Sequence, residues 1–588
     1  MPPMKLPHHL ADTALSRLFL ESRFAQDVVT FSLPGGSTLY EAGEEADHIY
    51  FLRAGRLGAI RQDEGMDPHF LGVIRPGEPA GEMAMISGTV HSAKVVALRD
   101  SEILALSRAA FFKAADEDAK IMAQLARLMI QRARQTASRA SLGAPSVFGF
   151  YGMTEDVKAR EQVEQIAHAI RRLGYSICVM GVEAERSSTE WFSTAEQGHD
   201  FILYVAEANE TYWKNVVGRQ VDRLFLMAKG AGVPEDCVPT LLPEPLLRQR
   251  LVDLILIQSA DCLLPSGSEA WLDGLPVAQL FHIRDRSDDH YARMARFFTG
   301  MAVGLVLSGG GARAYAHIGA IKALRESDTP IDFVCGTSMG AVIAAALAMG
   351  WDDEEINWRI RKAFVDSSPL DDIAFPMIAM TRGIKVEERL EEHFGDFQIA
   401  DLWLPFFCVS SNLTIGTYQL HARGQLRWSL RASLSLPGIL PPVNDGDNVL
   451  VDGGVMKNLP ADVLRNMHRG PIVAVDVSRA RGLSANDVAR PRSLWRWLWS
   501  GEWRQGPPIV ALLMRAGTVS TGRDLIASRE ASDVLVVPNL AGIDIRDWEA
   551  FAPAVSAGYV AMKAALERLR HPITDIGRRE SRNDYSGA

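Results

Sequence analysis

The sequence predicts an α/β protein of several domains, on the basis of its length and of two glycine-rich turns near its middle. The chain has 588 residues, of which 47% are hydrophobic, which is enough for two to four globular domains. Two apolar segments, 303–307 and 333–335, each run into a glycine-rich turn that is followed by a helix-like segment. Strand, turn and helix repeated in this order are typical of α/β domains. The net charge of −10 argues against nucleic-acid binding.

The first 140 residues have the pattern of a small β domain with flanking helices. From Val28 onward, short apolar segments are separated by glycine and proline turns, which predicts a β-roll. A helix is predicted at roughly Glu117–Ala140, because its apolar residues fall on one stripe. The segments 51–57 and 76–85 resemble the cyclic-nucleotide-binding domains, so we expect a domain of that fold over residues 1–140.

The resemblance also implies where a nucleotide would bind. In that family a glutamate binds the ribose hydroxyl, and an arginine nine residues later pairs with the cyclic phosphate. Glu82 matches the glutamate, but His91 stands in the place of the arginine, and Lys94 is a poor substitute. We therefore expect a module kept for packing, dimerisation or autoinhibition, with cyclic-nucleotide binding as the open alternative.

Residues 146–300 alternate between strand-like and helix-like segments, which predicts an intermediate α/β domain. Small residues and a proline at 138–145 indicate a linker before it. The region has no Gly-x4-Gly-Lys-Ser/Thr sequence, so the phosphate cradle of a P-loop is not expected, and no motif assigns the domain a role. The predicted strands are 147–151, 176–180, 201–205, 223–227 and 254–258, and the predicted helices are 157–173 and 188–197.

The two glycine-rich turns carry the pattern of a serine hydrolase. The second turn reads Gly336-Thr337-Ser338-Met339-Gly340, which places a serine on a tight corner between a strand and a helix. The first turn places free backbone N–H groups at the start of a helix, where they can stabilise an oxyanion. The predicted oxyanion hole consists of Gly309, Gly310, Gly311, Ala312 and Arg313.

A third motif follows later in the chain. Asp452 ends an apolar segment and is followed by Gly453 and Gly454, so its carboxylate is expected on a loop at the end of a strand. The three motifs together resemble the patatin-like phospholipases. The stretch 431–442 and the two preceding domains make the chain similar to the bacterial branch of the neuropathy target esterase family. Ala314 departs from the glycine usual at that place, for which we expect an adjusted loop.

The resemblance implies a three-layer α/β/α catalytic domain over residues 301–570 and a two-residue active site without histidine. Ser338 is the expected nucleophile and Asp452 the expected general base. The expected substrate is a phospholipid or lysophospholipid, whose fatty-acyl ester is cleaved through an acyl-enzyme with no metal and no cofactor. The alternative is a regulatory or scaffold protein with a vestigial hydrolase core.

An α/β-hydrolase triad, in which a histidine follows the aspartate, is the competing chemistry. The histidines after Asp452 are His468 and His571. His468 is predicted at the end of a helix, and His571 precedes a proline in a charged tail, so we expect both on the surface. Residues 571–588 are predicted to be a disordered tail.

Two further features concern the cellular setting. Five scattered cysteines without a CxxC motif indicate reduced thiols, and the N-terminus lacks a signal-peptide pattern, so we expect a cytoplasmic protein. A cluster of tryptophan and arginine residues is consistent with contact at the inner face of a membrane, or with a packed loop or dimer contact. The cluster contains Trp495, Trp497, Trp499 and Trp503.

Overall fold

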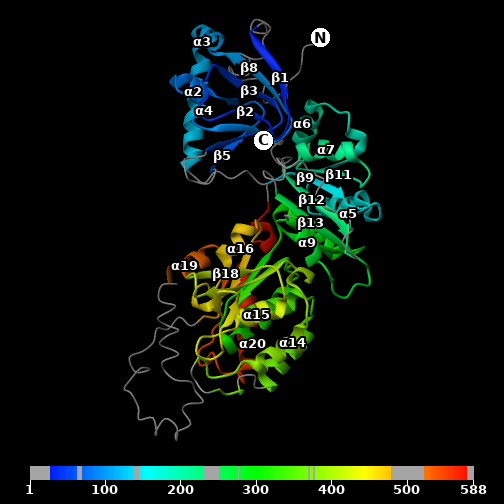
Figure 1. Cartoon of the computed structure of the whole chain (residues 1–588), viewed down its shortest axis with the longest axis vertical. Helices are drawn as coiled ribbons and strands as arrows, with labels where there is room; N and C mark the ends of the chain where they lie inside the picture. The colour runs from blue at the N-terminus through cyan, green and yellow to red at the C-terminus, as the bar shows by residue number, and fades with distance from the viewer. Residues whose placement is uncertain are drawn as a thin grey trace. The chain divides into compact units, whose positions relative to one another are not determined.

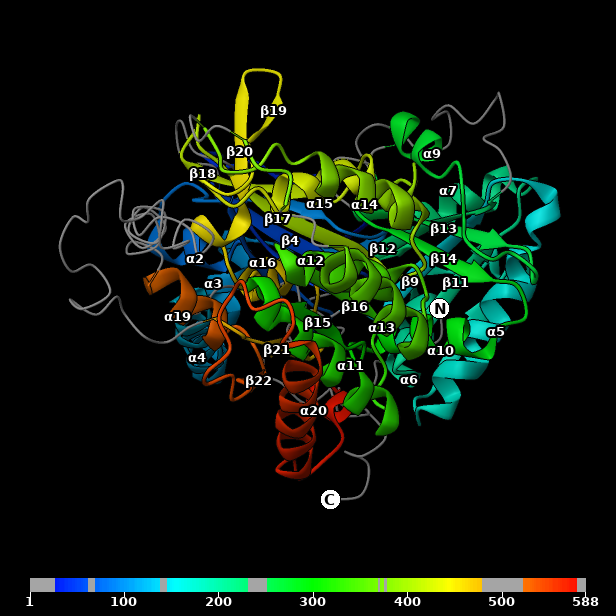
Figure 2. The ribbon, with the colours of Figure 1, turned by 90° about the horizontal axis from the view of Figure 1, so that it is seen from below.

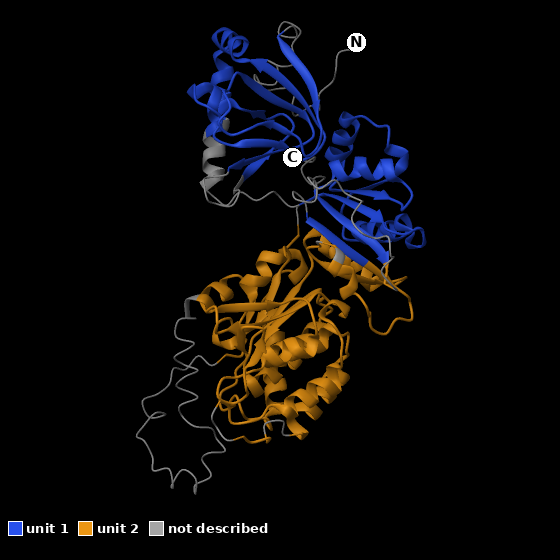
Figure 3. Ribbon diagram, in the orientation of Figure 1, with its two compact units in different colours: residues 1–228, 235–255, 580–588 blue, residues 229–234, 256–579 orange. Residues whose placement is uncertain are grey.

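The computed structural model describes most of the chain as two compact units, which Figure 3 distinguishes by colour. The described residues within 1–228 and 235–255 form the first unit, and those within 229–234 and 256–579 form the second. The predicted domain at 146–300 therefore contributes to both units. The described residues are 27–61, 69–137, 145–230, 251–275, 277–367, 371–374, 378–478 and 522–578. The tryptophan cluster lies outside them.

The predicted β-roll is confirmed, with its strands between Val28 and Ser107. It consists of two antiparallel sheets with the orders β1-β8-β3-β6 and β2-β7-β4-β5 (Figure 1). The helix predicted at roughly 117–140 is preceded by another, because Asp118 has an extended backbone and its carboxylate accepts the N–H of Lys120. The elements are β1 (Val28–Leu33), β2 (Thr38–Tyr40), β3 (His48–Ala54), β4 (Leu57–Arg61), β5 (His69–Ile74), β6 (Pro79–Ala80), α2 (Glu82–Ser87), β7 (Lys94–Ala97), β8 (Ser101–Ser107), α3 (Arg108–Glu117) and α4 (Ala119–Ala137).

A six-stranded sheet follows, with the order β10-β11-β9-β12-β13-β14. Its strands β10, β11, β9 and β12 are parallel, which agrees with the alternating pattern of the sequence. All five predicted strands are present, whereas helix α7 was not predicted. The elements are β9 (Val147–Gly152), α5 (Ala159–Arg172), β10 (Ile177–Met180), α6 (Thr189–Gly198), β11 (Phe201–Ala206), α7 (Thr211–Gln220), β12 (Arg223–Lys229), β13 (Leu251–Gln258), α9 (Glu269–Gly274), β14 (Leu280–Arg284) and α10 (Asp288–Thr299).

The rest of the second unit is built on a sheet with the order β19-β20-β17-β16-β15-β21-β22, and β18 pairs with β17 outside this path. Strands β17, β16, β15, β21 and β22 are parallel, so their carboxyl ends meet at one edge. The strands are β15 (Gly304–Leu307), β16 (Phe333–Thr337), β17 (Phe406–Asn412), β18 (Thr417–His421), β19 (Val443–Asp445), β20 (Asn448–Asp452), β21 (Ile472–Val475) and β22 (Val534–Val536).

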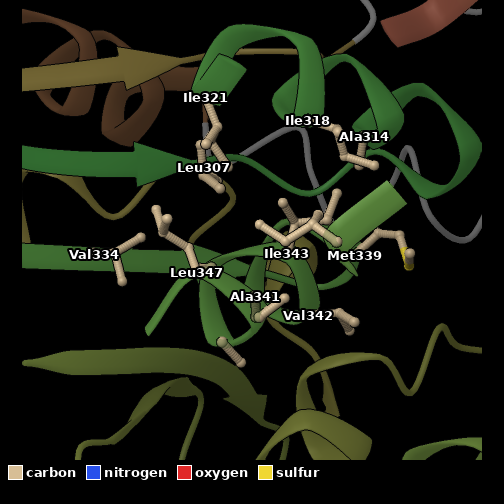
Figure 4. Close-up of a cluster of buried hydrophobic side chains, with 14 of the residues drawn as sticks. Leu307, Ala314, Ile318, Ile321, Val334, Met339, Ala341, Val342, Ile343 and Leu347 are labelled. Atoms are coloured by element: carbon tan, nitrogen blue, oxygen red, sulfur yellow. The ribbon is translucent and has the colours of Figure 1, made fainter. Parts of the chain in front are cut away.

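Helices cover both faces of this sheet. Successive residues of a strand point to opposite faces, so each strand can pack against helices on both sides. Leu305 and Leu307 of β15 belong to the large apolar cluster that also holds the buried residues of α11 and α12, part of which Figure 4 shows. Gly304 faces α16 instead, where the Cδ2 atom of Leu464 lies 2.7 Å from an added Cβ. The α/β fold with a parallel central sheet is thus confirmed. The main helices are α11 (Ala316–Glu326), α12 (Met339–Ala348), α13 (Asp353–Arg361), α14 (Ile384–Phe394), α15 (Leu426–Ser433), α16 (Ala461–Met467), α19 (Gly522–Glu530) and α20 (Phe551–Glu567).

Helices α11 and α20 lie side by side at very short range (Figure 2). A Cβ added to Gly319 would lie 1.9 Å from the carbonyl oxygen of Val555, and one added to Gly558 would lie 1.8 Å from that of Ala316. A side chain at either glycine would therefore push the helices apart. Helix α20 begins at Phe551 and includes Pro553, which is tolerated in the first turn of a helix.

Residues 571–578 are part of the fold, which corrects the predicted start of a disordered tail at residue 571. Helix α21 (Ile573–Ile576) buries the side chain of Ile573. Gly577 approaches the backbone so closely that an added Cβ would lie 2.2 Å from the carbonyl oxygen of Gly300. The charged residues around Ile573 made this segment look like an exposed tail in the sequence. Residues 579–588 lie outside the described part of the chain.

Cys178, Cys262, Cys335 and Cys408 are free thiols. Among the described helices, none is both long enough and apolar enough to span a bilayer.

Candidate active site

The serine of the Gly-x-Ser-x-Gly motif lies between β16 and α12. Its backbone has φ 54° and ψ −131°, a conformation that side-chain-bearing residues rarely adopt and that strains the chain. Glycine is required at positions 336 and 340 because a side chain there would clash with the backbone. A Cβ on Gly336 would lie 2.7 Å from the carbonyl carbon of Gly340, and one on Gly340 would lie 2.4 Å from the carbonyl oxygen of Ser308. The chain thus doubles back tightly and holds the Ser338 side chain at the carboxyl end of the strand.

The aspartate of the Asp-Gly-Gly motif is brought to this serine by strand pairing. Asp452 ends β20, which runs antiparallel to β17 with Asp452 opposite Ser410. The Ser338 hydroxyl donates a hydrogen bond of 2.5 Å to Oδ2 of Asp452. The other carboxylate oxygen accepts the backbone N–H of Gly454 at 2.7 Å. A buried serine therefore donates directly to a carboxylate that is also buried.

The carboxylate of Asp452 has a perturbed pKa. Burial raises its pKa from 3.8 to about 6, against the lowering effect of the hydrogen bonds from Ser338 and Gly454. The group is thus mostly ionised at neutral pH, yet it is far more basic than an exposed aspartate. A carboxylate with these properties can accept the proton of a hydroxyl nucleophile.

The glycine-rich loop lies beside the serine. A Cβ added to Gly309 would lie 3.0 Å from the Cβ atom of Ser338. Three of the five expected N–H donors already have acceptors: Gly309 donates to Asn458 at 3.3 Å, Ala312 to Ile545 at 2.9 Å and Arg313 to Gly310 at 3.2 Å, in each case to a carbonyl oxygen. The N–H groups of Gly310 and Gly311 have no acceptor among the described residues. These two donors are available for an anion.

The side chain of Arg313 holds the loop in place. Its Nε donates to the carbonyl oxygen of Val477 at 2.8 Å, and its Nη1 donates to that of Ile543 at 3.2 Å. These contacts give the Arg313 side chain a supporting role in the loop.

Two residues of the site carry no role in the sequence-based prediction. The hydroxyl of Ser433 accepts the backbone N–H of Ser338 at 2.9 Å and donates to the carbonyl oxygen of Val409 at 2.7 Å. The side-chain amide of Asn458 donates to the carbonyl oxygen of Gly309 at 3.3 Å. Ser433 lies in the stretch 431–442 that contributed to the resemblance, and Asn458 follows the Asp-Gly-Gly motif. Their closeness to these motifs is the sequence feature that could have identified them as site residues.

The two histidines of the competing triad are not at this site. His571 is exposed, as predicted. His468 is buried, so its predicted surface position is wrong. Its ring packs 4.6 Å from that of Phe333, at the beginning of β16 and at the opposite end of that strand from Ser338. Within the described part of the chain, no histidine hydrogen-bonds to Ser338 or Asp452.

The nucleotide-like site of the β-roll has a histidine where a cation would be needed. The His91 ring stacks on Tyr40 with the ring centres 3.7 Å apart, and burial lowers the pKa of His91. Lys94 pairs with Glu41 at 2.7 Å. Glu82 is buried at the start of α2. At neutral pH this arrangement presents an uncharged imidazole where an arginine would bind phosphate.

Among the described residues, no group of three or more histidine, cysteine, aspartate or glutamate side chains is arranged to hold a metal ion.

The chain matches two known protein families. Residues 305–465 match the patatin-like phospholipase family, and residues 30–118 match the cyclic nucleotide-binding domain. An uncharacterized NTE family protein of Mycobacterium tuberculosis (strain CDC 1551 / Oshkosh) is 30% identical over 563 residues, covering 93% of each chain. The protein belongs to this NTE (neuropathy target esterase) family.

Longer relatives share the same region. Patatin-like phospholipase domain-containing protein 7 of Rattus norvegicus is 28% identical and aligns with 84% of this chain and 41% of its own length. Lysophospholipase nte1 of Aspergillus fumigatus is 25% identical and aligns with 95% of this chain and 43% of its own length.

Proposed function

We propose that the protein is a serine acyl hydrolase that cleaves fatty-acyl esters of phospholipids and lysophospholipids. The observation that carries this proposal is the 2.5 Å hydrogen bond from Ser338 to Asp452 beside a loop with two unoccupied N–H donors. The patatin-like region and the relative named as a lysophospholipase support a lipid ester as the substrate.

The proposed reaction has two steps. Ser338 Oγ attacks the ester carbonyl while Asp452 accepts the hydroxyl proton. The N–H groups of Gly310 and Gly311 stabilise the oxyanion, and Asp452 returns the proton to the leaving alcohol. In the second step Asp452 accepts a proton from water, which attacks the acyl-enzyme, and the fatty acid leaves as Ser338 regains its proton.

Two assays test this function. A fluorophosphonate probe is expected to label Ser338 in the folded protein, and a panel of mono- and diacyl phospholipids is expected to release fatty acid. We expect the monoacyl lipids to be the better substrates. A folded protein that is neither labelled nor active on any lipid of the panel would contradict the proposal and would favour a scaffold with a vestigial site.

We further propose that the enzyme acts at the cytoplasmic surface of a membrane. The turn between β17 and β18 exposes two apolar side chains, with 51% of Leu413 and 64% of Ile415 accessible to solvent. Strand β17 pairs with β20, which carries Asp452, so this turn belongs to the same sheet as the site. Exposed apolar side chains next to a lipid-cleaving site suit insertion into a lipid surface.

Replacing both Leu413 and Ile415 with serine is expected to lower activity on phospholipid vesicles by about 10-fold, because less apolar area enters the lipid. Activity on a water-soluble ester should stay unchanged. Val560→Ser on α20 is the control, since this valine is 61% exposed on a different element. Equal losses on vesicles and on the soluble ester would contradict the surface-binding role.

For the β-roll we propose a packing or regulatory role without cyclic-nucleotide binding, because His91 is neutral and stacked where the family has an arginine. Calorimetric titration of the whole protein with cAMP and with cGMP is expected to show no saturable binding in the micromolar range. Saturable binding of either nucleotide that a Glu82→Ala variant abolishes would overturn this expectation.

A further inference from the structure

A cavity of about 470 Å³ lies within the second unit. It lies at the end of helix α12 that is far from Ser338. Its lining includes Leu347 and Gly350 at the end of α12 and the segment 328–331 that leads into β16. Helix α12 has ten residues, so its two ends are about 15 Å apart. In Figure 4, Met339 and Leu347 mark these opposite ends. The cavity is therefore separate from the candidate active site.

The cavity has a cationic lining. Arg284, Arg293 and Arg325 contribute to it, and the acidic residue of the lining is Asp328. Arg325 already has a carboxylate partner, because it pairs with Asp353 at 2.5 Å. The two other arginines have no carboxylate within 4 Å among the residues that the structure describes.

Arg293 is the less usual of the two, because only 7% of its surface is exposed. Its Nη2 donates to the carbonyl oxygen of His282 at 2.7 Å, while its Nε is buried without a hydrogen-bond partner. The buried arginines Arg99 and Arg431, by contrast, pair with Asp222 and Glu387. The carboxylates of Asp332 and Asp289 act on Arg293 only from beyond ion-pair distance. A buried guanidinium without a paired carboxylate is costly, which favours a site completed by an anion.

The nearby carboxylate of Asp332 does not supply that counter-charge directly. It accepts two hydrogen bonds from Arg296, at 2.9 and 2.6 Å, and one from the backbone N–H of Val303 at 2.9 Å. Burial lowers the pKa of Arg293 to about 10, so the guanidinium stays charged at neutral pH.

Arg284 is held in place before any ligand arrives. Its guanidinium lies over the Trp403 ring, 4.6 Å from the ring centre, and its Nη2 donates to the carbonyl oxygen of Cys262 at 2.8 Å. Trp403 is fixed in turn, because its Nε1 donates to the carbonyl oxygen of Leu263 at 2.8 Å. The Nε of Arg284 is buried without a partner. A stacked guanidinium keeps its planar edge of donors for an anion.

We propose that this cavity binds the phosphate group of a small phosphate ester or of a lipid head group, through Arg284 and Arg293. The two arginines come from different elements, β14 and α10, and so approach a ligand from two directions. Several oxygens around one phosphorus can accept hydrogen bonds from both, whereas the two oxygens of a carboxylate suit a single guanidinium.

Binding is measured with the full-length Ser338→Ala protein, so that lipid is not turned over and the result does not depend on the proposed hydrolysis. The free probes are inorganic phosphate and sn-glycerol 3-phosphate, titrated by calorimetry. The lipid probe is a phosphatidylcholine vesicle with and without phosphatidic acid, in a flotation assay. Saturable binding of a free probe assigns the site to a soluble ester, and binding only to vesicles with phosphatidic acid assigns it to a head group.

Arg284→Gln is expected to weaken the binding by about 10-fold or more, because a charge-assisted hydrogen-bonding group is lost. Arg361→Gln is the matched control, since it removes the same charge from a 60% exposed side chain outside the cavity. Thr329→Trp is a second variant that fills the cavity and keeps both arginines, and it is expected to abolish binding with an unchanged melting temperature. The proposal is overturned if no probe binds at millimolar concentration, or if Arg284→Gln and Thr329→Trp bind like Arg361→Gln.

Discussion

Replacing Ser338 with alanine, or Asp452 with asparagine, is expected to lower the turnover of a lysophospholipid by on the order of 10⁴-fold or more. Alanine removes the nucleophile, and asparagine cannot accept the proton that the serine hydroxyl must lose. Since the two groups act as one unit through their 2.5 Å hydrogen bond, the double variant should be no slower than either single variant. Steady-state release of fatty acid measures all three.

Two histidine variants are the controls for this result. His571→Ala changes an exposed residue and should have no effect on turnover. His468→Ala removes a buried ring that packs on Phe333, so it is expected to lower the melting temperature while turnover by the folded fraction is kept. A triad mechanism would give the opposite pattern, in which a folded His468→Ala protein is inactive and Asp452→Asn retains activity.

The sequence predicted those parts of the site that short local patterns determine. Gly336 and Gly340 were predictable because only glycine fits the tight turn around Ser338. The placement of Asp452 at a strand end was predictable from the apolar segment before it and the two glycines after it. The β-roll and the parallel sheets were also predictable, because the spacing of apolar residues and turns is a local property.

The parts that the sequence did not predict depend on partners far away in the chain. Which N–H groups of the glycine-rich loop stay free is decided by Ile545 and Asn458, whose carbonyl oxygens occupy two of the five donors. His468 resembles a surface residue in its polar local context, yet tertiary packing buries it against Phe333. The cavity between α10 and the end of α12 left no pattern in the sequence for the same reason.

The second large effect concerns pH. The rate constant kcat/KM for a water-soluble ester is expected to fall about tenfold for each pH unit below the pKa of Asp452, which is about 6. The reason is that protonated Asp452 cannot accept the serine proton. A soluble ester avoids the titration of lipid head groups. A rate that stays constant between pH 7 and pH 5 in the folded protein would contradict the role of Asp452 as the base.

The same pKa shift predicts a cost in stability. The folded-state pKa of Asp452 is about 6 and its ordinary value is 3.8, so the folded state binds this proton more tightly than the unfolded state. Protonated Asp452 therefore contributes favourably to the free energy of unfolding. This contribution is nearly complete below about pH 4 and is lost as the pH rises through 6. From about pH 3 to pH 8 the ionisation of this group costs the folded state about 3 kcal/mol.

Asp452→Asn should remove this cost, since the amide does not titrate. The variant is expected to melt several degrees above the wild type at pH 8 and at nearly the same temperature at pH 4. Because the hydrogen bond from Ser338 lowers the pKa of Asp452, Ser338→Ala should shift the midpoint of the stability change to a higher pH. Thermal melts of the three proteins across this range measure both effects. The contrary result is a difference in melting temperature between Asp452→Asn and the wild type that does not vary with pH. It would mean that burial does not raise the pKa of Asp452 and does not make the catalytic base more basic.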